Sequence, residues 1–591
     1  MTFEPGAVRE RALRLALENA LRHGAPPRPE SVLGALLGSD AALRPHRGEL
    51  SGTVESVIAE VSLLDAEHRK SRLAELGGPL TTTSARKEAE AKHEQEHGLP
   101  PLPGAEMGKV VLRLAPFPSG SLHIGNARGL FVNQEYRQRY RGKFFLVFDD
   151  TVGSEEKRPV PESYDLILQD MAAAGIQPDA IYYKSDRLEL YYRDLPRLLD
   201  LGAAYVCTCP AELLRKNREA GVACPERSRE TPWQRDQWAG MLGGRYAPGE
   251  AVVRIKTDMG HPNPAFRDRV LFRISDFHHP RVGTRYRVWP MLEYAFAIDD
   301  VELGITHVIR GKELIIEDMM EEALWRALGL RGPAFLHWGL LRIRETKISK
   351  SKSYQDVKSG AYDGWADPRT WSLSSLSRRG IRPQAIRDFV LSFGLSQSDI
   401  EVPAETLYAE NRRLLDPTTP RRAFVPRPRR LRVEGMPGDL RVARLANHPE
   451  RPEMGEREVE ISDAFFLPEA DLLKNAGKEI RLKDLLNVQL PPQVPPSEGV
   501  EADGEAGAEV IATFTTRPNK PLPRIQWVAA KGATHIDVFT LEDPHLLGMG
   551  EASLSSSREG QLFQFERFGF VRADPQPEDP EQPRRFIFAH P

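Results

Sequence analysis

The chain has 591 residues and a net charge of −3, with 40% hydrophobic and 28% charged residues. This length exceeds what one hydrophobic core supports, so we expect several domains. The near-neutral charge excludes a globally basic protein, so any nucleic-acid binding must use local basic patches. No apolar run approaches the roughly 20 residues of a membrane span, and no signal peptide is recognisable. Three cysteines argue against a disulfide framework and predict a cytoplasmic protein.

Residues 1–104 predict a helical N-terminal extension followed by a linker. Apolar side chains recur at helical spacing between Val8 and Leu21 and again between Val54 and Leu64. A charged stretch and a Pro-rich segment follow, so we place a domain boundary at residue 104. Two interpretations of the extension stay open, a surface that contacts a nucleic acid or docks a partner and a segment that packs on the main body.

Residues 105–200 alternate between strand and helix patterns. Strands are predicted at Lys109–Leu112 and Phe144–Phe148, and a helix at Glu162–Ala173. Such alternation predicts a parallel sheet covered on both faces, which binds ligands beyond the carboxyl ends of its strands. Asp149 and the loop that begins at Arg113 both lie at that edge.

The loop after the first strand has the features of an anion site. It leads into a helix whose first N–H groups are unpaired and whose dipole favours negative charge. His123 lies just before this helix, where its ring can contact a phosphate. Two prolines stiffen the loop and two glycines allow a ligand to approach its backbone. These four residues are Pro116, Pro118, Gly120 and Gly125.

Residues 201–285 break the alternation and predict an inserted domain with mixed helix and strand. It holds all the cysteines, Cys207, Cys209 and Cys224, which are three ligands of the type that zinc prefers. Glu226 and His261 are the candidates for a fourth ligand. Ordinary cysteines without a metal stay open as the alternative, because the four-ligand pattern is incomplete.

The sheet pattern resumes over residues 286–355, and residues 356–416 predict a small helical region. Residues 417–591 contain short alternating runs between Pro and Gly turns, which predict antiparallel β-barrels. Six arginines between Arg421 and Arg432 are candidates for phosphate contacts. Trp527 and Phe568 have the spacing of core residues.

Two stretches in this order resemble the signature motifs of class I aminoacyl-tRNA synthetases. Arg113–Arg128 resembles the HIGH motif, and Lys347–Ser351 resembles the KMSKS loop. Further stretches extend the resemblance to archaeal-type glutamyl-tRNA synthetases over most of the chain. Among them are Phe148–Thr151, Arg254–Thr257, Ile305–Lys312, Leu407–Asn411 and Arg481–Leu485.

The resemblance implies an α/β multidomain protein with a Rossmann-like catalytic domain in two halves, residues 105–200 and 286–355. It implies that residues 201–285 bind the acceptor stem and that residues 356–416 contact the tRNA stem. It also implies that two barrels in residues 417–591 read the anticodon. We expect a monomer that binds tRNA(Glu), and the resemblance leaves tRNA(Gln) open as a second substrate.

The implied reaction joins glutamate and ATP to glutamyl-adenylate and then transfers the acyl group to the 3′ end of the tRNA. The first step needs positioning and cancellation of negative charge more than covalent help, and Mg²⁺ normally accompanies the polyphosphate. The implied catalytic residues are His123, Asn126, Lys347 and Lys350. The implied ATP-binding residues are Pro116, Pro118, Gly120, His123, Gly125, Asn126, Ser349 and Lys350.

For the amino acid, the resemblance implies that Asp149 takes the ammonium group. Arg113 and Arg310 would each take a carboxylate by a two-pronged charged hydrogen bond. Arg310 favours glutamate over glutamine, because related glutaminyl enzymes have a neutral residue at this position and a buried unpaired arginine is costly. The alternative is that Arg310 forms a structural ion pair with Glu313 or Asp299.

Three residues depart from the family pattern. Asn126 replaces the second histidine of HIGH, Leu292 replaces a tyrosine found in many relatives, and Val301 replaces a histidine. Asparagine can still donate a hydrogen bond to a phosphate or ribose oxygen. These departures keep open the alternative of a non-catalytic tRNA-binding protein. Within the class, a glutaminyl enzyme is the other alternative, and Arg310 argues against it.

Overall fold

The computed structural model describes residues 5–23, 27–39, 43, 46–76, 98–152, 158–344, 350–494, 509–579 and 581–591. The chain divides into two compact units, Met1–Gly98 and Leu99–Pro591. Among the described helices, none combines the length and the apolar character that crossing a membrane requires.

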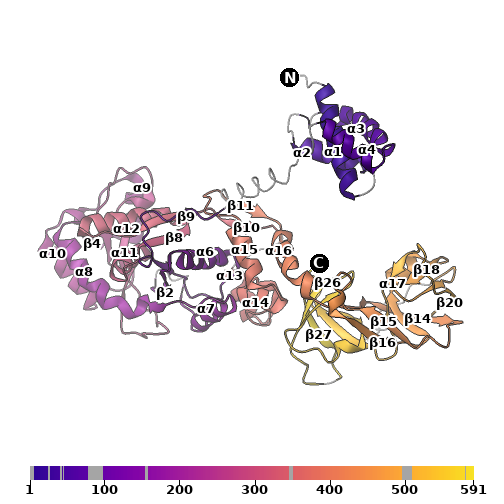
Figure 1. Ribbon diagram of the computed structural model, residues 1–591. Coiled ribbons are helices and arrows are strands. Elements are labelled where there is room, and N and C mark those ends of the chain that lie inside the picture. The colour runs from indigo at the N-terminus through magenta and orange to yellow at the C-terminus, as the bar shows by residue number, and fades with distance from the viewer. Residues whose placement is uncertain are drawn as a thin grey trace. The chain divides into compact units, whose positions relative to one another are not determined.

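The N-terminal unit is helical, as predicted (Figure 1). Its helices are α1 (Pro5–His23), α2 (Pro29–Ser39), α3 (Arg47–Ser62) and α4 (Ala66–Glu75). Their apolar faces form a core of their own that includes Ala12, Leu36 and Val57. The unit ends at residue 98 and not at 104, because Leu99 and Leu102 pack into the core of the second unit.

A parallel sheet of five strands in the order β3-β2-β1-β8-β9 organises the second unit. Its strands are β1 (Val111–Leu114), β2 (Lys143–Phe148), β3 (Ala180–Tyr183), β8 (His307–Gly311) and β9 (Ala334–Trp338). Side chains alternate along β2, so that Phe144 and Leu146 join one hydrophobic cluster while Phe145 and Val147 join another. Both faces of β2 are therefore covered, as the sequence predicts.

The crossover helices α6 (Ile124–Tyr140) and α7 (Glu162–Ala173) contribute to the larger of these two clusters. After α8 (Leu188–Asp200), the inserted region forms an antiparallel sheet in the order β4-β5-β6-β7. Its elements are β4 (Ala204–Cys207), α9 (Ala211–Ala220), η3 (Pro225–Ser228), α10 (Thr231–Leu242), β5 (Val252–Ile255), η4 (Pro264–Phe266), β6 (Val270–Ile274) and β7 (Val288–Pro290). This sheet extends to residue 290, five residues beyond the predicted boundary at 285.

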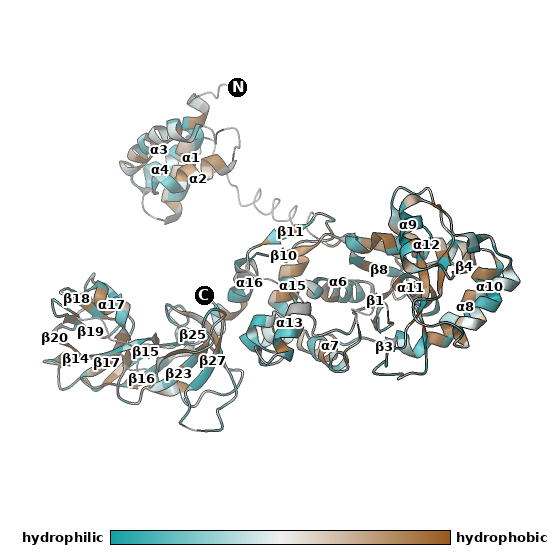
Figure 2. Ribbon diagram, turned by 180° about the vertical axis from the view of Figure 1, so that it is seen from behind, coloured by the Kyte–Doolittle hydropathy of each residue, from teal (hydrophilic) through white to brown (hydrophobic). Residues whose placement is uncertain are grey.

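The chain returns to the parallel sheet through α11 (Leu292–Glu302), and α12 (Ile315–Leu328) follows β8. Beyond β9, strand β10 (Leu341–Ile343) pairs in parallel with β11 (Ile400–Val402). The helical region contains α13 (Lys350–Lys358), α14 (Leu373–Arg379), α15 (Pro383–Leu391) and α16 (Glu405–Leu415). Hydrophobic stretches run along α15 and β8 in Figure 2, and Phe389 of α15 and Ile309 of β8 share one core.

The C-terminal region forms two curled sheets of seven strands each, in the orders β12-β25-β26-β27-β23-β24-β13 and β21-β18-β19-β20-β14-β17-β22. Most strand pairs in these sheets are antiparallel, as the sequence predicts. Four strand pairs, β12–β25, β14–β20, β18–β21 and β23–β27, are parallel. Trp527 is buried in the core, and Phe568 packs against a core cluster while partly buried. Arg429 is one of the six arginines predicted to contact phosphates. It is buried beside Glu469, so the prediction is wrong for this residue.

The first of these sheets contains β12 (Arg421–Arg422), β13 (Phe424–Pro426), β23 (Thr534–Phe539), β24 (Leu546–Gly550), β25 (Leu562–Phe565), β26 (Gly569–Ala573) and β27 (Arg584–His590). The second contains β14 (Pro428–Glu434), β17 (Ala464–Pro468), β18 (Glu479–Leu482), β19 (Leu486–Gln489), β20 (Val510–Thr516), β21 (Arg524–Ile525) and β22 (Val528–Ala529). A separate hairpin joins β15 (Val442–Ala446) to β16 (Glu456–Glu460), and α17 (Glu469–Lys474) follows β17.

Candidate active site

The turn from β1 into α6 is closed by a capping box between His123 and Asn126. The backbone N–H of Gly125 donates to Nδ1 of His123 at 3.0 Å, and the backbone N–H of His123 donates to Oδ1 of Asn126 at 3.2 Å. Because Nδ1 accepts a hydrogen bond, the neutral ring carries its proton on Nε2, which makes Nε2 a donor. Asn126 therefore has a structural role at the position where HIGH has its second histidine.

Both glycines of this turn make room for the protein's own rings. Gly120 has φ +149°, and a Cβ there would clash with the indole ring of Trp365. A Cβ on Gly125 would lie 2.8 Å from Cε1 of His123. The sequence predicts that these glycines let a ligand approach, whereas the structure explains them by packing of Trp365 and of the capping histidine.

A buried carboxylate holds the loop in place. Asp170 of α7 accepts hydrogen bonds from the backbone N–H of Leu122 at 2.6 Å and of Ser374 at 3.0 Å, and also from the hydroxyl of Ser121. Hydrogen bonds to Asp170 thus link the loop to the helical region that follows the KMSKS-like stretch. Asp170 is a positioning residue that the sequence interpretation missed.

A pocket of about 520 Å³ opens at the N-terminus of α6. Its lining includes His123, Gly125, Asn126 and Arg128 from the turn and α6, with Glu313, Glu401 and residues 338 and 340–344 opposite them. The pocket thus meets the positive end of the helix dipole, as an anion site should.

The other predicted ATP-binding residues do not all line this pocket. Pro116 and Pro118 accept backbone hydrogen bonds from Asp149 at 3.1 Å and Val160 at 2.9 Å, and so position the loop. Lys347 and Ser349 lie outside the described residues. Lys350 begins α13, and its side chain also lies outside what the structure describes.

The residues predicted to bind the amino acid lie at the carboxyl edge of the sheet, and each already has a charged partner. Arg113 is 4% exposed and forms a two-pronged pair with Asp300, with Nη2 at 2.8 Å from Oδ2. Asp149 accepts a hydrogen bond from Nζ of Lys184 at 2.7 Å. Asp300, like its neighbour Asp299, belongs to α11, and Lys184 begins the 3₁₀ helix η2 (Lys184–Arg187) after β3.

Arg310 is 7% exposed and pairs with two acids of α12. Its Nε donates to Oδ1 of Asp318 at 2.8 Å, and its Nη2 donates to Oε1 of Glu321 at 2.7 Å. The predicted alternative partners, Glu313 and Asp299, are wrong: Asp299 pairs with Arg187, and Glu313 lines the pocket. Nη1 of Arg310 is buried and has no hydrogen-bond partner among the described residues.

Burial raises the pKa of Glu321 to about 8, although the Arg310 charge opposes this shift. His337 also contacts Asp318. The sequence contains no pattern that singles out Asp318, Glu321 or His337, because their contact depends on how α12 packs against β8 and β9.

Phe296 of α11 brings the cations together. Its ring centroid lies 3.2 Å from Nζ of Lys184, and 3.9 Å and 5.7 Å from the guanidinium carbons of Arg113 and Arg310. Such contacts with an aromatic face stabilise cations. The predicted residues Arg113 and Arg310 therefore do converge, through a phenylalanine and a lysine that the sequence interpretation missed.

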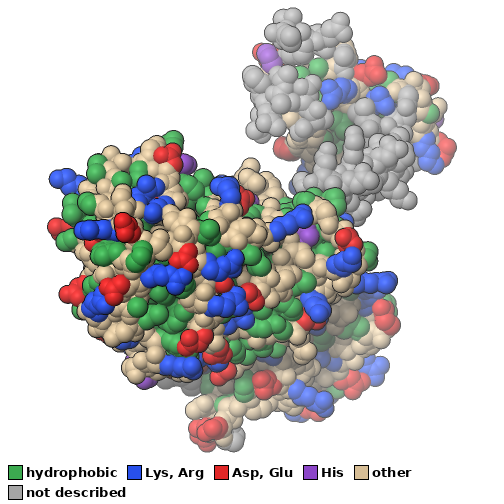
Figure 3. Space-filling view, turned by 90° about the vertical axis from the view of Figure 1, so that its left-hand side faces the viewer, with side chains coloured by type: hydrophobic (Ala, Val, Ile, Leu, Met, Phe, Trp, Pro, Cys, Tyr) green, Lys and Arg blue, Asp and Glu red, His purple; other side chains and the backbone are tan. Residues whose placement is uncertain are grey.

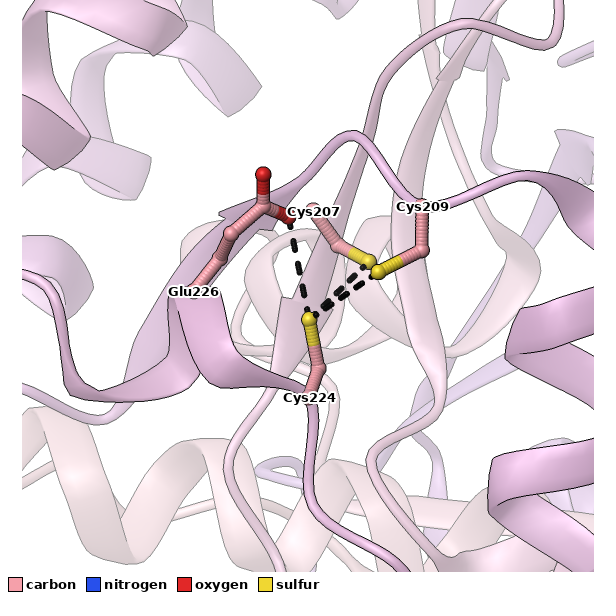
Figure 4. A group of neighbouring side chains, drawn as sticks. All are labelled: Cys207, Cys209, Cys224 and Glu226. Atoms are coloured by element: carbon pink, nitrogen blue, oxygen red, sulfur yellow. Dashed lines mark hydrogen bonds between the residues drawn. The ribbon is translucent and has the colours of Figure 1, made fainter.

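The three cysteines converge in the inserted region (Figure 4). The Cys224 sulfur lies 3.6 Å from that of Cys207 and 3.3 Å from that of Cys209, and Oε2 of Glu226 lies 3.7 Å from the Cys224 sulfur. Two thiolates on one tetrahedral zinc, with Zn–S of about 2.3 Å, are about 3.8 Å apart, so this donor set fits zinc. His261 is not in this group, because its ring bonds to the backbone of Asn263.

The parallel sheet, the anion-type pocket at its first helix and the insertion after its third strand define a class I aminoacyl-tRNA synthetase. Residues 109–417 match the family of class I tRNA synthetases (E and Q), catalytic domain, and residues 419–502 match the anti-codon binding domain of the same group. The chain therefore belongs to the class I tRNA synthetases (E and Q).

Among curated relatives, the chain is 41% identical to a glutamate–tRNA ligase of Pyrococcus abyssi, over 95% of this chain and 96% of that protein. It is 41% identical to a glutamate–tRNA ligase of Pyrococcus furiosus, over 96% and 97% of the two chains. It is 38% identical to a glutamate–tRNA ligase of Methanocella arvoryzae, over 95% and 96%. The similarity thus includes the N-terminal helical unit and the C-terminal sheets.

Proposed function

We propose that this protein is a glutamate–tRNA ligase, which activates L-glutamate with ATP and transfers it to tRNA(Glu). The observation that carries the proposal concerns the buried guanidinium of Arg310. Its Nη1 has no hydrogen-bond partner among the described residues. A carboxylate satisfies such a group better than an amide does, so Arg310 favours glutamate over glutamine. The names of the relatives agree with this choice.

In the first step, the carboxylate of glutamate attacks the α-phosphorus of ATP and pyrophosphate leaves. The pocket at α6 would hold the phosphates through the first-turn N–H groups and Nε2 of His123. Lys347 and Lys350 would neutralise the leaving pyrophosphate. Mg²⁺, when bound to the phosphates, cancels further negative charge.

The amino acid would lie beyond the ends of β1, β2 and β8. Arg113 and Arg310 would bind its carboxylates, and Asp149 would bind its ammonium group. Bringing glutamate and ATP together in this way accelerates reaction mainly by positioning. Transfer to the tRNA then releases AMP.

Charging assays test this proposal. Purified protein with ATP and Mg²⁺ is given radiolabelled glutamate or glutamine and either tRNA(Glu) or tRNA(Gln), with tRNA present throughout. We expect glutamate and not glutamine to be attached to tRNA(Glu). Attachment of glutamate to tRNA(Gln) as well would show a relaxed choice of tRNA, and its absence would show a strict one. Loss of all charging with tRNA binding retained would favour a non-catalytic tRNA-binding protein. The monomeric state and cytoplasmic location stay predictions.

For tRNA binding, we propose a basic pocket of about 320 Å³ in the C-terminal region, lined by Lys483, Arg524, Gln526 and Arg567 among others. Oε1 of Gln526 is buried and has no hydrogen-bond partner among the described residues. It is therefore available to accept a hydrogen bond from an N–H group of a nucleotide base. By contrast, the face of the inserted region in Figure 3 carries basic and acidic side chains interspersed. Local pockets of this kind agree with the near-neutral net charge.

Replacing Arg524 with Ala is expected to weaken tRNA(Glu) binding by roughly 5- to 100-fold, because a good side-chain contact to a base contributes about 1–3 kcal/mol. The KM for glutamate should not change. Filter binding and charging kinetics measure the two effects. Arg444→Ala, an exposed arginine of β15 paired with Glu458, is the matched control. Equal losses in both variants would rule out a specific role for this pocket.

We also propose that Cys207, Cys209, Cys224 and Glu226 hold a structural zinc ion. Cys224→Ala is expected to remove zinc and to lower the unfolding temperature of the inserted region, because metal binding contributes to folding. Metal analysis should find about one zinc per wild-type chain, and chelation should reproduce the variant's thermal shift. A wild-type protein without zinc whose unfolding temperature matches that of the variant would contradict this prediction.

A further inference from the structure

Lys184 has surroundings that are unusual for a lysine. Its side chain is 0% exposed, and lysines are almost never fully buried unless they are paired. Its ammonium group lies 2.7 Å from Oδ1 of Asp149 and 3.2 Å from the centroid of the Phe296 ring. Burial disfavours a charged amine unless an anion is close, and the Asp149 carboxylate is the anion in ion-pair contact with Lys184.

The other acids near Lys184 have donors of their own. Asp150 accepts hydrogen bonds from the hydroxyls of Tyr164 and Ser185, and Asp299 pairs with Arg187. Within the described part of the chain, Lys184 is also the only cation paired with Asp149. Among the described charged groups, Asp149 and Lys184 therefore form an ion pair only with each other.

The proposed function gives Asp149 a second cation to bind, the α-ammonium group of the amino acid. The carboxylate then either gives up Lys184 or holds two ammonium groups side by side. The first choice leaves a buried lysine without a counter-ion, and the second places like charges next to each other. Each choice weakens the attraction between Asp149 and the substrate's amino group.

We propose that Lys184 is a specificity-determining residue, an internal ammonium group that competes with the substrate's ammonium for Asp149. This inference rests on the proposed function, in which Asp149 receives that ammonium. The site then recognises its substrate mainly through carboxylates, by Arg113 and Arg310. It discriminates poorly between glutamate and glutarate, which has both carboxylates but lacks the amino group.

The test compares ligands that differ only in the amino group. The KM for glutamate is measured by ATP–pyrophosphate exchange in the presence of tRNA(Glu), and the inhibition constant of glutarate is measured in the same assay. Wild-type protein, Lys184→Met and Lys184→Arg are compared. Lys143→Met is the matched control, since Lys143 is exposed at the start of β2, the strand that Asp149 follows.

We expect the ratio of the glutarate inhibition constant to the glutamate KM to rise at least about tenfold in Lys184→Met, because Asp149 becomes available to the substrate alone. Lys184→Arg and Lys143→Met should keep the wild-type ratio. An unchanged ratio in Lys184→Met overturns the proposal. A wild-type ratio near 10⁴, the discrimination typical of a site built around a substrate's N–H group, overturns it without any variant.

Thermal unfolding provides a readout that does not depend on activity. Lys184→Met leaves Asp149 buried without its cation, so the variant should unfold at a lower temperature than wild type. Saturating glutamate should then raise its unfolding temperature by more than it raises that of wild type, and glutarate should not. Equal shifts with both ligands would overturn the proposal. Glutamate charging by the wild-type protein tests the proposed function separately, because it does not depend on this comparison.

Discussion

Arg310→Gln is expected to raise the KM for glutamate at least about 30-fold, which corresponds to roughly 2 kcal/mol or more for losing one partner of a buried charge pair. The structure places Arg310 at the end of β8, with Nη1 buried and unpartnered within the described residues. Glutamine has no negative charge at its side chain, so its own KM should change much less. Charging kinetics with both amino acids measure the effect.

A control is needed because Arg310 also pairs with Asp318 and Glu321. Asp318→Asn removes a structural partner of Arg310 while the guanidinium stays. If Arg310 acts on the substrate, Arg310→Gln raises the KM for glutamate far more than Asp318→Asn does. If both variants only lower the unfolding temperature and leave the KM unchanged, Arg310 is a structural residue and the basis for glutamate specificity lies elsewhere.

The sequence predicts the catalytic sheet well because each strand is a short apolar run with helices between. β2 is apolar over Phe144–Phe148, and the structure buries both of its faces. The helical N-terminal unit follows from apolar periodicity in the same way. The parallel strand pairs of the C-terminal sheets could not be predicted, because they join segments far apart in the chain, such as β12 and β25.

The residues at the carboxyl edge were partly predictable. Arg113 and Asp149 directly follow predicted strands and Arg310 ends one, so their position at one edge could be inferred. Their partners could not, because Lys184, Asp300 and Glu321 reach them only through packing of η2, α11 and α12. A sequence motif identifies the side chain that faces the ligand. The neighbouring charged residues, which the motif does not identify, determine whether that side chain is available to bind the ligand.

The departures from the family pattern illustrate the same limit. Asn126 closes the capping box with His123, a role that spacing alone suggests only weakly. Val301 packs against the hydrophobic cluster around α11 and α12, so it contributes to the core. Nothing in the structure explains why Leu292 stands at the position where the family resemblance implies a tyrosine.

His123→Asn is expected to lower the rate of adenylate formation by roughly 10²- to 10³-fold, the loss typical of removing one donor that stabilises charge in a transition state. Asparagine caps helices well, so the start of α6 should survive and the unfolding temperature should stay close to that of wild type. ATP–pyrophosphate exchange and thermal unfolding measure the two properties separately.

His123→Ala removes the cap together with the ring, so it should lower stability by about 1 kcal/mol and also slow adenylate formation. The pair of variants therefore separates the two roles that the structure combines in one side chain. Nδ1 holds the turn through Gly125, and Nε2 is the donor assigned to the phosphates. A His123→Asn variant with the full wild-type rate would show that the ring serves only as a cap. Phosphate binding would then depend on the first-turn N–H groups of α6 and on the KMSKS-like loop.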